Sequence, residues 1–166
     1  MPTISDPVFL LKLLVLLGVA NGTPVFATKL FKNRFATPLD GGLKLADGRP
    51  LFGTSKTIRG ILVSIACTTL AAPALGLGWT VGATSAVGSV IGDLASSFVK
   101  RRLGFRVHAQ AFGLDQVPEA LLPLLLLRSR LELSVVDMAI LVAAFILFEV
   151  VLSYVLFKLR IRDRPY

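Results

Sequence analysis

Two aspartates and a run of basic residues in the second half of the chain are the side chains best suited to chemistry on phosphates. Asp93 lies near the end of an apolar stretch, Lys100, Arg101 and Arg102 follow it, and Asp115 comes after the next loop. A carboxylate at membrane depth costs about 3 kcal/mol or more, so it is a candidate functional group that faces the protein interior beside a cation or a metal ion. These residues predict a polar site at one end of an apolar helix.

The spacing of the residues before this basic run separates a polar face from an apolar face. If the stretch is a helix, one side carries small and polar side chains, namely Ser85, Ser89, Asp93, Ser96, Ser97 and Lys100. The opposite side is apolar, with Val87, Ile91, Leu94 and Phe98. We expect the apolar side to contact lipid or neighbouring helices, and the helix to end at Gly104, a natural C-cap.

A second polar segment, residues 38–59, leads into another apolar stretch. It has turn signals at Asp40-Gly41-Gly42 and Asp47-Gly48, and Gly53-Thr54-Ser55-Lys56-Thr57 lies directly before the apolar residues. Helix N-terminal amides, hydroxyls and a lysine can bind an anion, although the spacing is not that of a Walker A loop. The alternative is that Thr54 or Ser55 caps the helix while Lys56 and Arg59 anchor it at the membrane surface.

The composition indicates an integral membrane protein. Of the 166 residues, 54% are hydrophobic, and the mean hydropathy is +0.76, which is too apolar for a soluble domain of this size. Four stretches reach the roughly 20 residues that a span needs. They cover residues 8–30, 57–77, 79–99 and 135–157, and a shorter one covers 116–127, which is either re-entrant or continues to 133. We expect an all-α integral membrane protein, a bundle of about five transmembrane helices with a cytoplasmic polar loop, forming a single transmembrane domain over residues 1–166.

The distribution of Lys and Arg predicts the orientation in the membrane. Seven lie between residues 29 and 59, four between 100 and 106, and four from 158 onwards, whereas Arg128 and Arg130 fall on the other side. The positive-inside rule then predicts a protein of the cell (cytoplasmic) membrane with its N-terminus outside and its C-terminus cytoplasmic. The cytoplasmic parts would be loops at about 31–56 and 100–115 and the tail 158–166. The net charge of +8 suits anionic headgroups and phosphates, and we expect no nucleic-acid partner.

Several other residues have more than one interpretation. Asn21-Gly22-Thr23-Pro24 should either unwind the first span beside a cavity or form a plain proline kink. Asp115 could cap a helix whose first turn holds Pro118 and Glu119. Glu149 either pairs with Lys12 or another residue or is functional.

Two residues have little bearing on function. Cys67 is the only cysteine, so no disulfide can form within the chain. We expect the only histidine, His108, to be a loop residue and not a catalytic base.

The order of the motifs resembles the phosphatidate cytidylyltransferases. Their signature region is similar to Gly92-Asp93-Leu94, Ser97, Lys100-Arg101 and Gly104, followed by Gly113-Leu114-Asp115 and Leu122-Pro123. Their upstream Lys-Thr-x-x-Gly element resembles Lys56-Thr57 and Arg59-Gly60. In its length and in the residues from Asp40 to Gly60, the chain more closely resembles the smaller CDP-archaeol synthase family, whose first helix is similar at Ala20-Asn21 and Pro24. The resemblance covers residues 20–123.

The chain departs from the larger enzymes at three places. They carry Lys-Asp after the basic run and His-Gly-Gly before the second aspartate, where this chain has Arg106-Val107 and Ala111-Phe112-Gly113. The acid that follows their second aspartate is replaced here by Pro118, with Glu119 one position later.

The resemblance implies that CTP and a lipid phosphate, of the archaetidic- or phosphatidic-acid type, react to give a CDP-lipid and pyrophosphate. A phosphate monoester has a second pKa of about 6, so the lipid is already a dianionic nucleophile at neutral pH and needs no general base. The enzyme would be a Mg²⁺-dependent nucleotidyltransferase of membrane lipids, and a homo-oligomer is compatible with this interpretation.

The resemblance and the chemistry together assign roles to individual residues. Asp93 and Asp115 would bind Mg²⁺, which proteins typically hold through one or two carboxylates and phosphate oxygens. The catalytic cations would be Lys56, Arg59, Lys100 and Arg101. The substrate-binding residues would be Asn21, Asp40, Asp47, Arg49, Thr57 and Ser97.

Two other classes of function remain open. A small transporter or channel subunit could also use Asp93 and a broken first helix. A structural, lipid-binding membrane protein would need only the basic cytoplasmic face.

Overall fold

The computed structural model describes residues 6–158, and it confirms the all-helical fold class. Apart from two isolated β-bridges, Pro38 to Thr57 and Lys44 to Pro50, this part of the chain forms helices, turns and loops. The helices are α1 (Pro7–Phe31), α2 (Ile58–Ala74), α3 (Trp79–Arg102), α4 (Gln116–Leu131) and α5 (Val135–Lys158).

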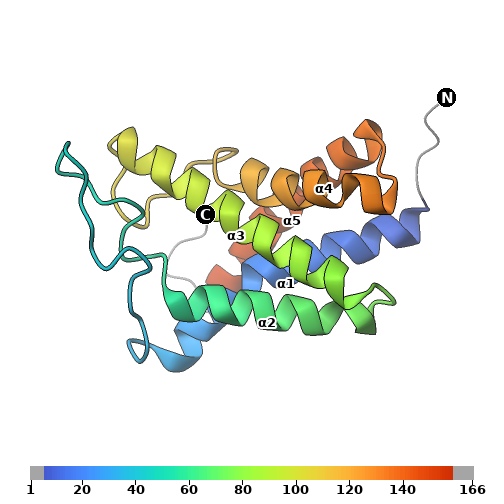
Figure 1. Cartoon of the computed structure of the whole chain (residues 1–166), viewed down its shortest axis with the longest axis horizontal. Coiled ribbons are helices and arrows are strands. Elements are labelled where there is room, and N and C mark those ends of the chain that lie inside the picture. The colour runs from blue at the N-terminus through green and yellow to red at the C-terminus, as the bar shows by residue number, and fades with distance from the viewer. Residues whose placement is uncertain (1–5, 159–166) are drawn as a thin grey trace.

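The helices form an elongated bundle with its two long connections at one end. Residues 32–57 and 103–115 lie together at the left in Figure 1, whereas the short α2–α3 and α4–α5 turns lie at the opposite end. Helix α3 packs against α1, α2 and α4, and α5 packs against α1 and α4. The polar segments identified in the sequence therefore meet at one end of the bundle, around the end of α3.

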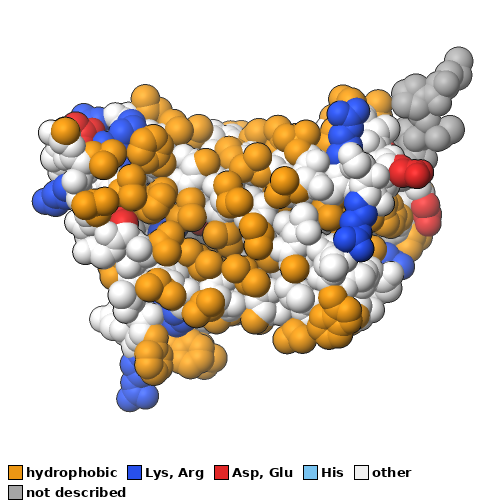
Figure 2. Space-filling model, in the orientation of Figure 1, with side chains coloured by type: hydrophobic (Ala, Val, Ile, Leu, Met, Phe, Trp, Pro, Cys, Tyr) orange, Lys and Arg blue, Asp and Glu red, His pale blue; other side chains and the backbone are white. Residues whose placement is uncertain are grey.

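Charged side chains lie mainly at the two ends of the molecule, as expected for a membrane protein. The middle of the face shown in Figure 2 is covered by hydrophobic and uncharged polar side chains. Among the described residues, two helical segments are long and apolar enough to cross a membrane on these criteria alone, Pro7–Phe31 and Val135–Val155. Helix α2 is apolar but has 17 residues, and α4 has 16, which is about 24 Å at about 1.5 Å per residue.

Helix α1 continues through the Asn21 to Pro24 segment, so the alternative of an unwound first span is wrong. Proline has no N–H and leaves the carbonyl four residues earlier without its helical donor. Here the carbonyl of Ala20 accepts a hydrogen bond from the buried Ser64 hydroxyl of α2, at 2.6 Å. The Asn21 amide donates to the carbonyl of Leu17 at 3.0 Å. A neighbouring helix thus satisfies the group that Pro24 leaves free.

The structure corrects the predicted N-cap of α2 and confirms the predicted end of α3. Thr57, and not Thr54 or Ser55, caps α2, because its hydroxyl accepts a hydrogen bond from the amide of Gly60 at 3.1 Å. At the end of α3, Gly104 has φ of +82° as predicted, and the amide of Phe105 donates to the carbonyl of Lys100 at 3.0 Å. This is the hydrogen bond of a Schellman motif.

The polar face of α3 is buried, as the spacing predicted. Ser85, Ser89, Ser96 and Ser97 are buried, whereas Val87, Ile91 and Phe98 are exposed on the other side. Small residues let α4 approach closely, because a Cβ at Gly88 would contact Pro123 and one at Gly92 would contact Pro118. This close approach brings the start of α4 beside Asp93.

The predictions about the tail, the domain bounds, the orientation of the termini and the oligomeric state stay untested. Most of the tail 158–166 lies outside the described residues, which end at Lys158. The single transmembrane domain over residues 1–166, the outside N-terminus, the cytoplasmic C-terminus and the homo-oligomer are also untested.

Candidate active site

Asp93 forms an ion pair with the lysine that precedes α2. Lys56 Nζ lies 2.5 Å from Oδ1 and 2.6 Å from Oδ2 of Asp93, and the two side chains are 20% and 33% exposed. The short turn that ends residues 38–57 positions Lys56, since its amide donates to the carbonyl of Gly53 at 3.2 Å. The structure thus brings together two predicted site residues that are 37 positions apart in the chain.

Glu119, in the first turn of α4, is a member of this centre that the sequence analysis did not assign to the site. Its carboxyl group hydrogen-bonds that of Asp93, and its charge also interacts with Lys56 and with Glu149 of α5. The hydroxyl of Ser89 donates to the backbone carbonyl of Glu119 at 2.9 Å, which fixes α4 beside α3. Gly88 and Gly92 of α3 are the signal that the sequence offers, because small residues four positions apart allow a close helix contact, although they do not identify the partner helix.

Asp115 forms a second ion pair, with Lys100. Lys100 Nζ lies 2.6 Å from Asp115 Oδ1, within ion-pair distance but without the angles of a hydrogen bond, and it donates to the carbonyl of Ala109 at 3.0 Å. Asp115 Oδ2 accepts from the amide of Ala111 at 2.9 Å. Asp115 stands at the N-cap position of α4, yet its side chain does not cap the helix, so the capping interpretation is wrong.

Asp93 and Asp115 both lie where α3 contacts the start of α4. Asp115 and Glu119 are four residues apart at the start of α4, so they lie about one helical turn from each other on one side of the helix. Glu119 in turn contacts Asp93. Over residues 6–158 no group of three or more His, Cys, Asp or Glu side chains is placed to hold a metal ion.

Arg101, which follows Lys100 in α3 and was also predicted as a catalytic cation, is deeply buried. It is 3% exposed, its charge interacts with Asp115, and its Nε and Nη1 have no hydrogen-bond partner. It lines a cavity of about 260 Å³ with residues of two loops, namely Arg49, Pro50, Gly104, Phe105, Arg106 and Val107. A buried guanidinium with free N–H groups is suited to binding an anion.

Asp40 builds the loop that precedes α2. Its carboxylate accepts hydrogen bonds from the amides of Gly42, Phe52 and Gly53 at 2.9–3.0 Å. Partial burial alone would raise the pKa of Asp40, but these amides outweigh it and hold the pKa below its ordinary value. Asp40 therefore shapes the loop.

Asp47 and Arg49 fasten this loop to the end of α3. Asp47 accepts two hydrogen bonds from Arg102 Nη1, both 2.6 Å long. A hydrogen bond from the amide of Arg49 and the interaction with Arg102 lower the pKa of Asp47. Arg49 Nη1 donates to the backbone carbonyl of Arg102. The loop of residues 38–57 therefore lies against the helix that carries Asp93.

The structure places the remaining predicted residues away from the acids or inside the bundle. Arg59 donates to the carbonyls of Lys32 and Arg34, at 3.0 and 2.5 Å, and so ties the end of α1 to the start of α2. Thr57 is the cap of α2, Ser97 is buried in α3, and Asn21 bonds to its own helix. His108 is an exposed loop residue, as predicted.

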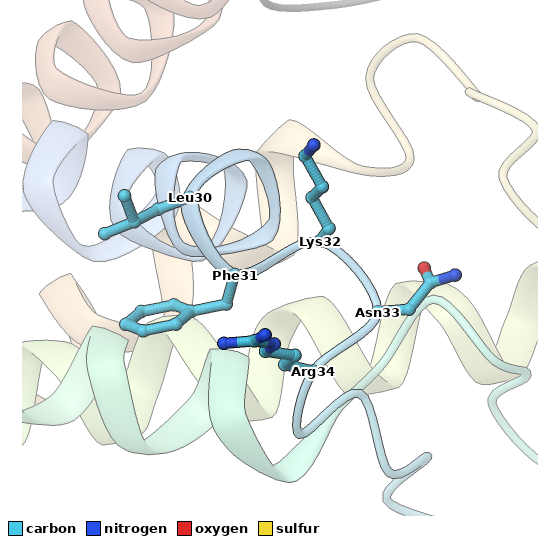
Figure 3. Close-up of a pocket in the computed structure, with 5 residues that line it drawn as sticks. All are labelled: Leu30, Phe31, Lys32, Asn33 and Arg34. Atoms are coloured by element: carbon cyan, nitrogen blue, oxygen red, sulfur yellow. The ribbon is translucent and has the colours of Figure 1, made fainter.

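A larger cavity than the one beside Arg101 lies elsewhere, at the end of α1. It has a volume of about 840 Å³ and is lined by Leu30, Phe31, Lys32, Asn33 and Arg34. Figure 3 shows the side chain of Arg34 pointing toward Phe31 while Lys32 points away from both. None of the predicted site residues lines it, so we assign the candidate site to the two ion pairs and the buried arginine.

Comparisons with known proteins agree on one family. A family model described as CarS-like, CDP-archaeol synthase, matches residues 74–166. The CDP-archaeol synthase of Pyrobaculum calidifontis is 34% identical over 156 residues, which cover 89% of this chain and 91% of that protein. The CDP-archaeol synthase of Sulfurisphaera tokodaii is 34% identical over the full length of both chains.

A solved structure is similar in fold as well as in sequence. It is described as that of an intramembrane enzyme for archaeal membrane lipid biosynthesis, and it superimposes with a TM-score of 0.75 at 33% identity. The match covers 89% of this chain and 94% of the other.

Proposed function

The chain belongs to the CDP-archaeol synthase family, and we propose that it transfers the cytidylyl group of CTP to a lipid phosphate, with release of pyrophosphate. Its relatives are CDP-archaeol synthases, which favours an archaeol-type ether lipid phosphate over phosphatidate as the substrate. The protein would act as an integral membrane enzyme, since its structural relative is an intramembrane enzyme.

The observation that carries this proposal is the pair of carboxylate–lysine contacts beside a buried arginine whose Nε and Nη1 have no hydrogen-bond partner. Lys56–Asp93 and Lys100–Asp115 lie at the loop end of α3, and Arg101 is buried with free N–H groups. Two reacting phosphates repel each other, so their reaction requires positive charge held in place before they meet. These residues offer fixed positive charge where the apolar bundle meets the polar loops.

The reaction needs no base from the protein. An oxygen of the dianionic lipid phosphate attacks the α-phosphorus of CTP, and the bond from that phosphorus to the bridging oxygen of the β-phosphate breaks. The electron pair leaves with pyrophosphate, whose growing negative charge we assign to Lys100 and Arg101. We assign Lys56, beside Asp93, to an oxygen of the α-phosphate.

Asp93 and Asp115 are suitable ligands for a Mg²⁺ ion whose coordination would be completed by substrate phosphates. Asp93 keeps a third of its side chain exposed, and the buried Oδ1 of Asp115 accepts no hydrogen bond, although it lies 2.6 Å from Lys100 Nζ. Mg²⁺ is usually bound by one or two carboxylates plus phosphate oxygens and water, so three protein ligands are not required. We propose Asp93 and Asp115 as its ligands. When bound, the ion would neutralise charge on the triphosphate.

Three residues first proposed as substrate ligands, and one first proposed as a catalytic cation, are better assigned to positioning. Asp40, Asp47 and Arg49 build the loop and fasten it to α3, and Arg59 ties α1 to α2. Thr57 and Ser97 remain proposed substrate contacts, because they belong to the same segments as Lys56 and Lys100. The proposed contact of Asn21 would require a substrate that reaches into the middle of α1.

Purified protein, CTP labelled in its α-phosphate, Mg²⁺ and a panel of lipid phosphates test the proposal. We expect labelled CDP-lipid, with an archaeol-type phosphate preferred, and its loss in Asp93→Ala and Asp115→Ala. Arg130→Gln, at the exposed far end of α4, is the matched control and should retain activity. No CDP-lipid with any lipid phosphate would instead favour a transport or structural role. Full activity in both aspartate variants would refute the site.

A further inference from the structure

The end of α1 carries an open cavity that the proposed reaction does not use. Its volume is about 840 Å³, and five consecutive residues line it, from Leu30 to Arg34. Helix α1 is long and apolar enough to cross a membrane, and it ends at Phe31. The cavity, which we call the α1-end cavity, therefore lies where a membrane-spanning helix reaches the polar loops, at the level expected for lipid headgroups.

Large apolar side chains are exposed around this turn. Leu30 is 76% exposed and Phe31 is 39% exposed, and Phe35, just beyond the cavity, is 75% exposed. Figure 2 shows hydrophobic side chains beside Lys or Arg side chains at the lower left, where Figure 1 places the end of α1. Such a surface is unfavourable in water, whereas the hydrocarbon chains of a lipid would cover it.

The same turn carries positive charge that the described fold does not neutralise. Within residues 6–158, no carboxylate lies within ion-pair distance of Lys32, Arg34 or Arg59. Arg59 is 9% exposed, and its hydrogen bonds go to neutral groups, two backbone carbonyls and the hydroxyl of Thr28. Its Nε is buried without an acceptor. A buried guanidinium without a counterion is costly, so an anion beside this turn would stabilise it.

Arg59 also holds the turn in the conformation that places apolar and cationic side chains together. Lys32 and Phe35 have φ of +48° and +56°, in the left-handed region that residues other than glycine seldom adopt. Arg59 donates to the carbonyls of Lys32 and Arg34, and its guanidinium lies over the ring of Phe31, 5.9 Å from the centroid. In Figure 3 the side chain of Arg34 points toward Phe31.

This combination fits a ligand that has both an anionic group and hydrocarbon chains. A soluble anion would leave Leu30 and Phe31 exposed to water, and a lipid without net charge would leave the guanidinium groups without a counterion. A guanidinium binds phosphate oxygens through charge-assisted hydrogen bonds, which suits a phosphate headgroup. An anionic lipid of the surrounding membrane meets both requirements.

We propose that the α1-end cavity binds one anionic phosphodiester lipid of the membrane, separate from the lipid that reacts. Arg34 binds its phosphate, and Leu30 and Phe31 contact its hydrocarbon chains. A phosphodiester has no dianionic phosphate to attack CTP, so this lipid is not a substrate. It fastens the start of the connection between α1 and α2 to the membrane surface. The inference does not depend on the proposed cytidylyl transfer.

Native mass spectrometry of the purified full-length protein in detergent tests this site, because it counts bound lipids. Titrated with phosphatidylglycerol, an anionic phosphodiester, the wild type should bind one lipid saturably, and it should bind the zwitterionic phosphatidylcholine at least tenfold more weakly. Arg34→Gln removes an exposed side-chain charge but keeps the carbonyl that accepts from Arg59, so it should fold normally. We expect it to bind phosphatidylglycerol about tenfold more weakly, the loss of one charge-assisted contact.

Lys44→Gln is the matched control. Lys44 is an exposed loop lysine outside the cavity, and its substitution changes the net charge by the same amount. It should bind phosphatidylglycerol with wild-type affinity. An equal loss in both variants would overturn the site, because binding would then follow net charge and not this cavity.

Two further outcomes decide the proposal. Equal phosphatidylglycerol affinity in the wild type and in Arg34→Gln would overturn it. Displacement of the lipid by glycerol 3-phosphate at the same concentration would also overturn it, because the ligand would then be a soluble anion. The titration contains no CTP, so Arg34-dependent lipid binding would support the site even in a protein that makes no CDP-lipid.

Discussion

Gly92 is the position at which α3 comes closest to α4, next to Asp93 in the chain. A Cβ added there would lie 2.5 Å from the carbonyl carbon of Pro118 and 2.8 Å from the amide nitrogen of Glu119, and closer still to the carbonyl oxygen of Pro118. An ordinary contact between carbon atoms is about 3.5–4.0 Å, so in Gly92→Ala the start of α4 must move by roughly 1 Å. The overlapping atoms belong to the backbone, so they cannot relieve the overlap by adopting another rotamer.

The magnitude of this effect follows from two opposing terms. Overpacking costs about 1–3 kcal/mol, and alanine in a helix interior is favoured over glycine by about 1 kcal/mol, so the net loss of stability is modest. The effect on activity should be larger, because Glu119 contacts Asp93 and a 1 Å displacement of reacting groups can cost about a hundredfold in rate. We therefore expect Gly92→Ala to lower kcat by about a hundredfold while the protein remains folded.

The assay is CDP-lipid formation together with a thermal melt in detergent. Gly22→Ala is the matched control, since a Cβ at Gly22 in α1 has no atom within 4 Å, and it should keep full activity and equal or better stability. Wild-type activity in Gly92→Ala would refute the α3–α4 contact as the element that positions Asp93. Equal losses in both variants would point to a general effect of alanine and not to this contact.

Three further predictions concern the cap, the loop and the second ion pair. Thr57→Ala should lose about 1 kcal/mol by removing the cap of α2 and lower the melting temperature by a few degrees, whereas Thr57→Ser should restore it. Since the pKa of Asp40 is lowered in the folded loop, the Asp40 carboxylate should stabilise the loop above about pH 4, and this stabilisation should be lost as the pH falls through the folded pKa. As the pH falls, the hydrogen exchange of residues 38–57, corrected for intrinsic rates, should therefore rise more in the wild type than in Asp40→Ala. Lys100→Met should reduce kcat by tenfold or more with little change in the KM for CTP, and a change confined to KM would contradict its role in the transition state.

The local pattern of the sequence was sufficient for the helices and for the faces of α3. The spacing of the serines predicted the buried side of α3, and Gly104 predicted its end, because both depend on residues within a few positions. The unwound α1 was wrong because Ser64, which is 44 positions from Ala20, supplies the hydrogen bond that Pro24 removes. A contact between residues so far apart in the chain cannot be predicted from a local sequence pattern.

The candidate site was predictable in its residue types but not in its partners. Motif order indicated Asp93, Asp115, Lys56, Lys100 and Arg101, yet which lysine pairs with which aspartate depends on how α2 and α4 pack on α3. Glu119 was missed for the same reason. Asp40, Asp47 and Arg59 look like ligands in a sequence, because acids and arginines in glycine-rich loops are typical of binding sites. In the fold their hydrogen bonds hold the loops together.

The most direct test of the central claim is Mg²⁺-dependent transfer of label from CTP to an archaeol-type lipid phosphate, measured in parallel for the wild type, Asp93→Asn and Arg130→Gln. We expect labelled CDP-lipid from the wild type and from Arg130→Gln, and its loss when Mg²⁺ is chelated. In Asp93→Asn we expect a decrease of about a hundredfold or more, since this substitution removes the charge that both Lys56 and the ion require. Wild-type rates in folded Asp93→Asn, or undiminished transfer in the absence of divalent ions, would contradict the central claim.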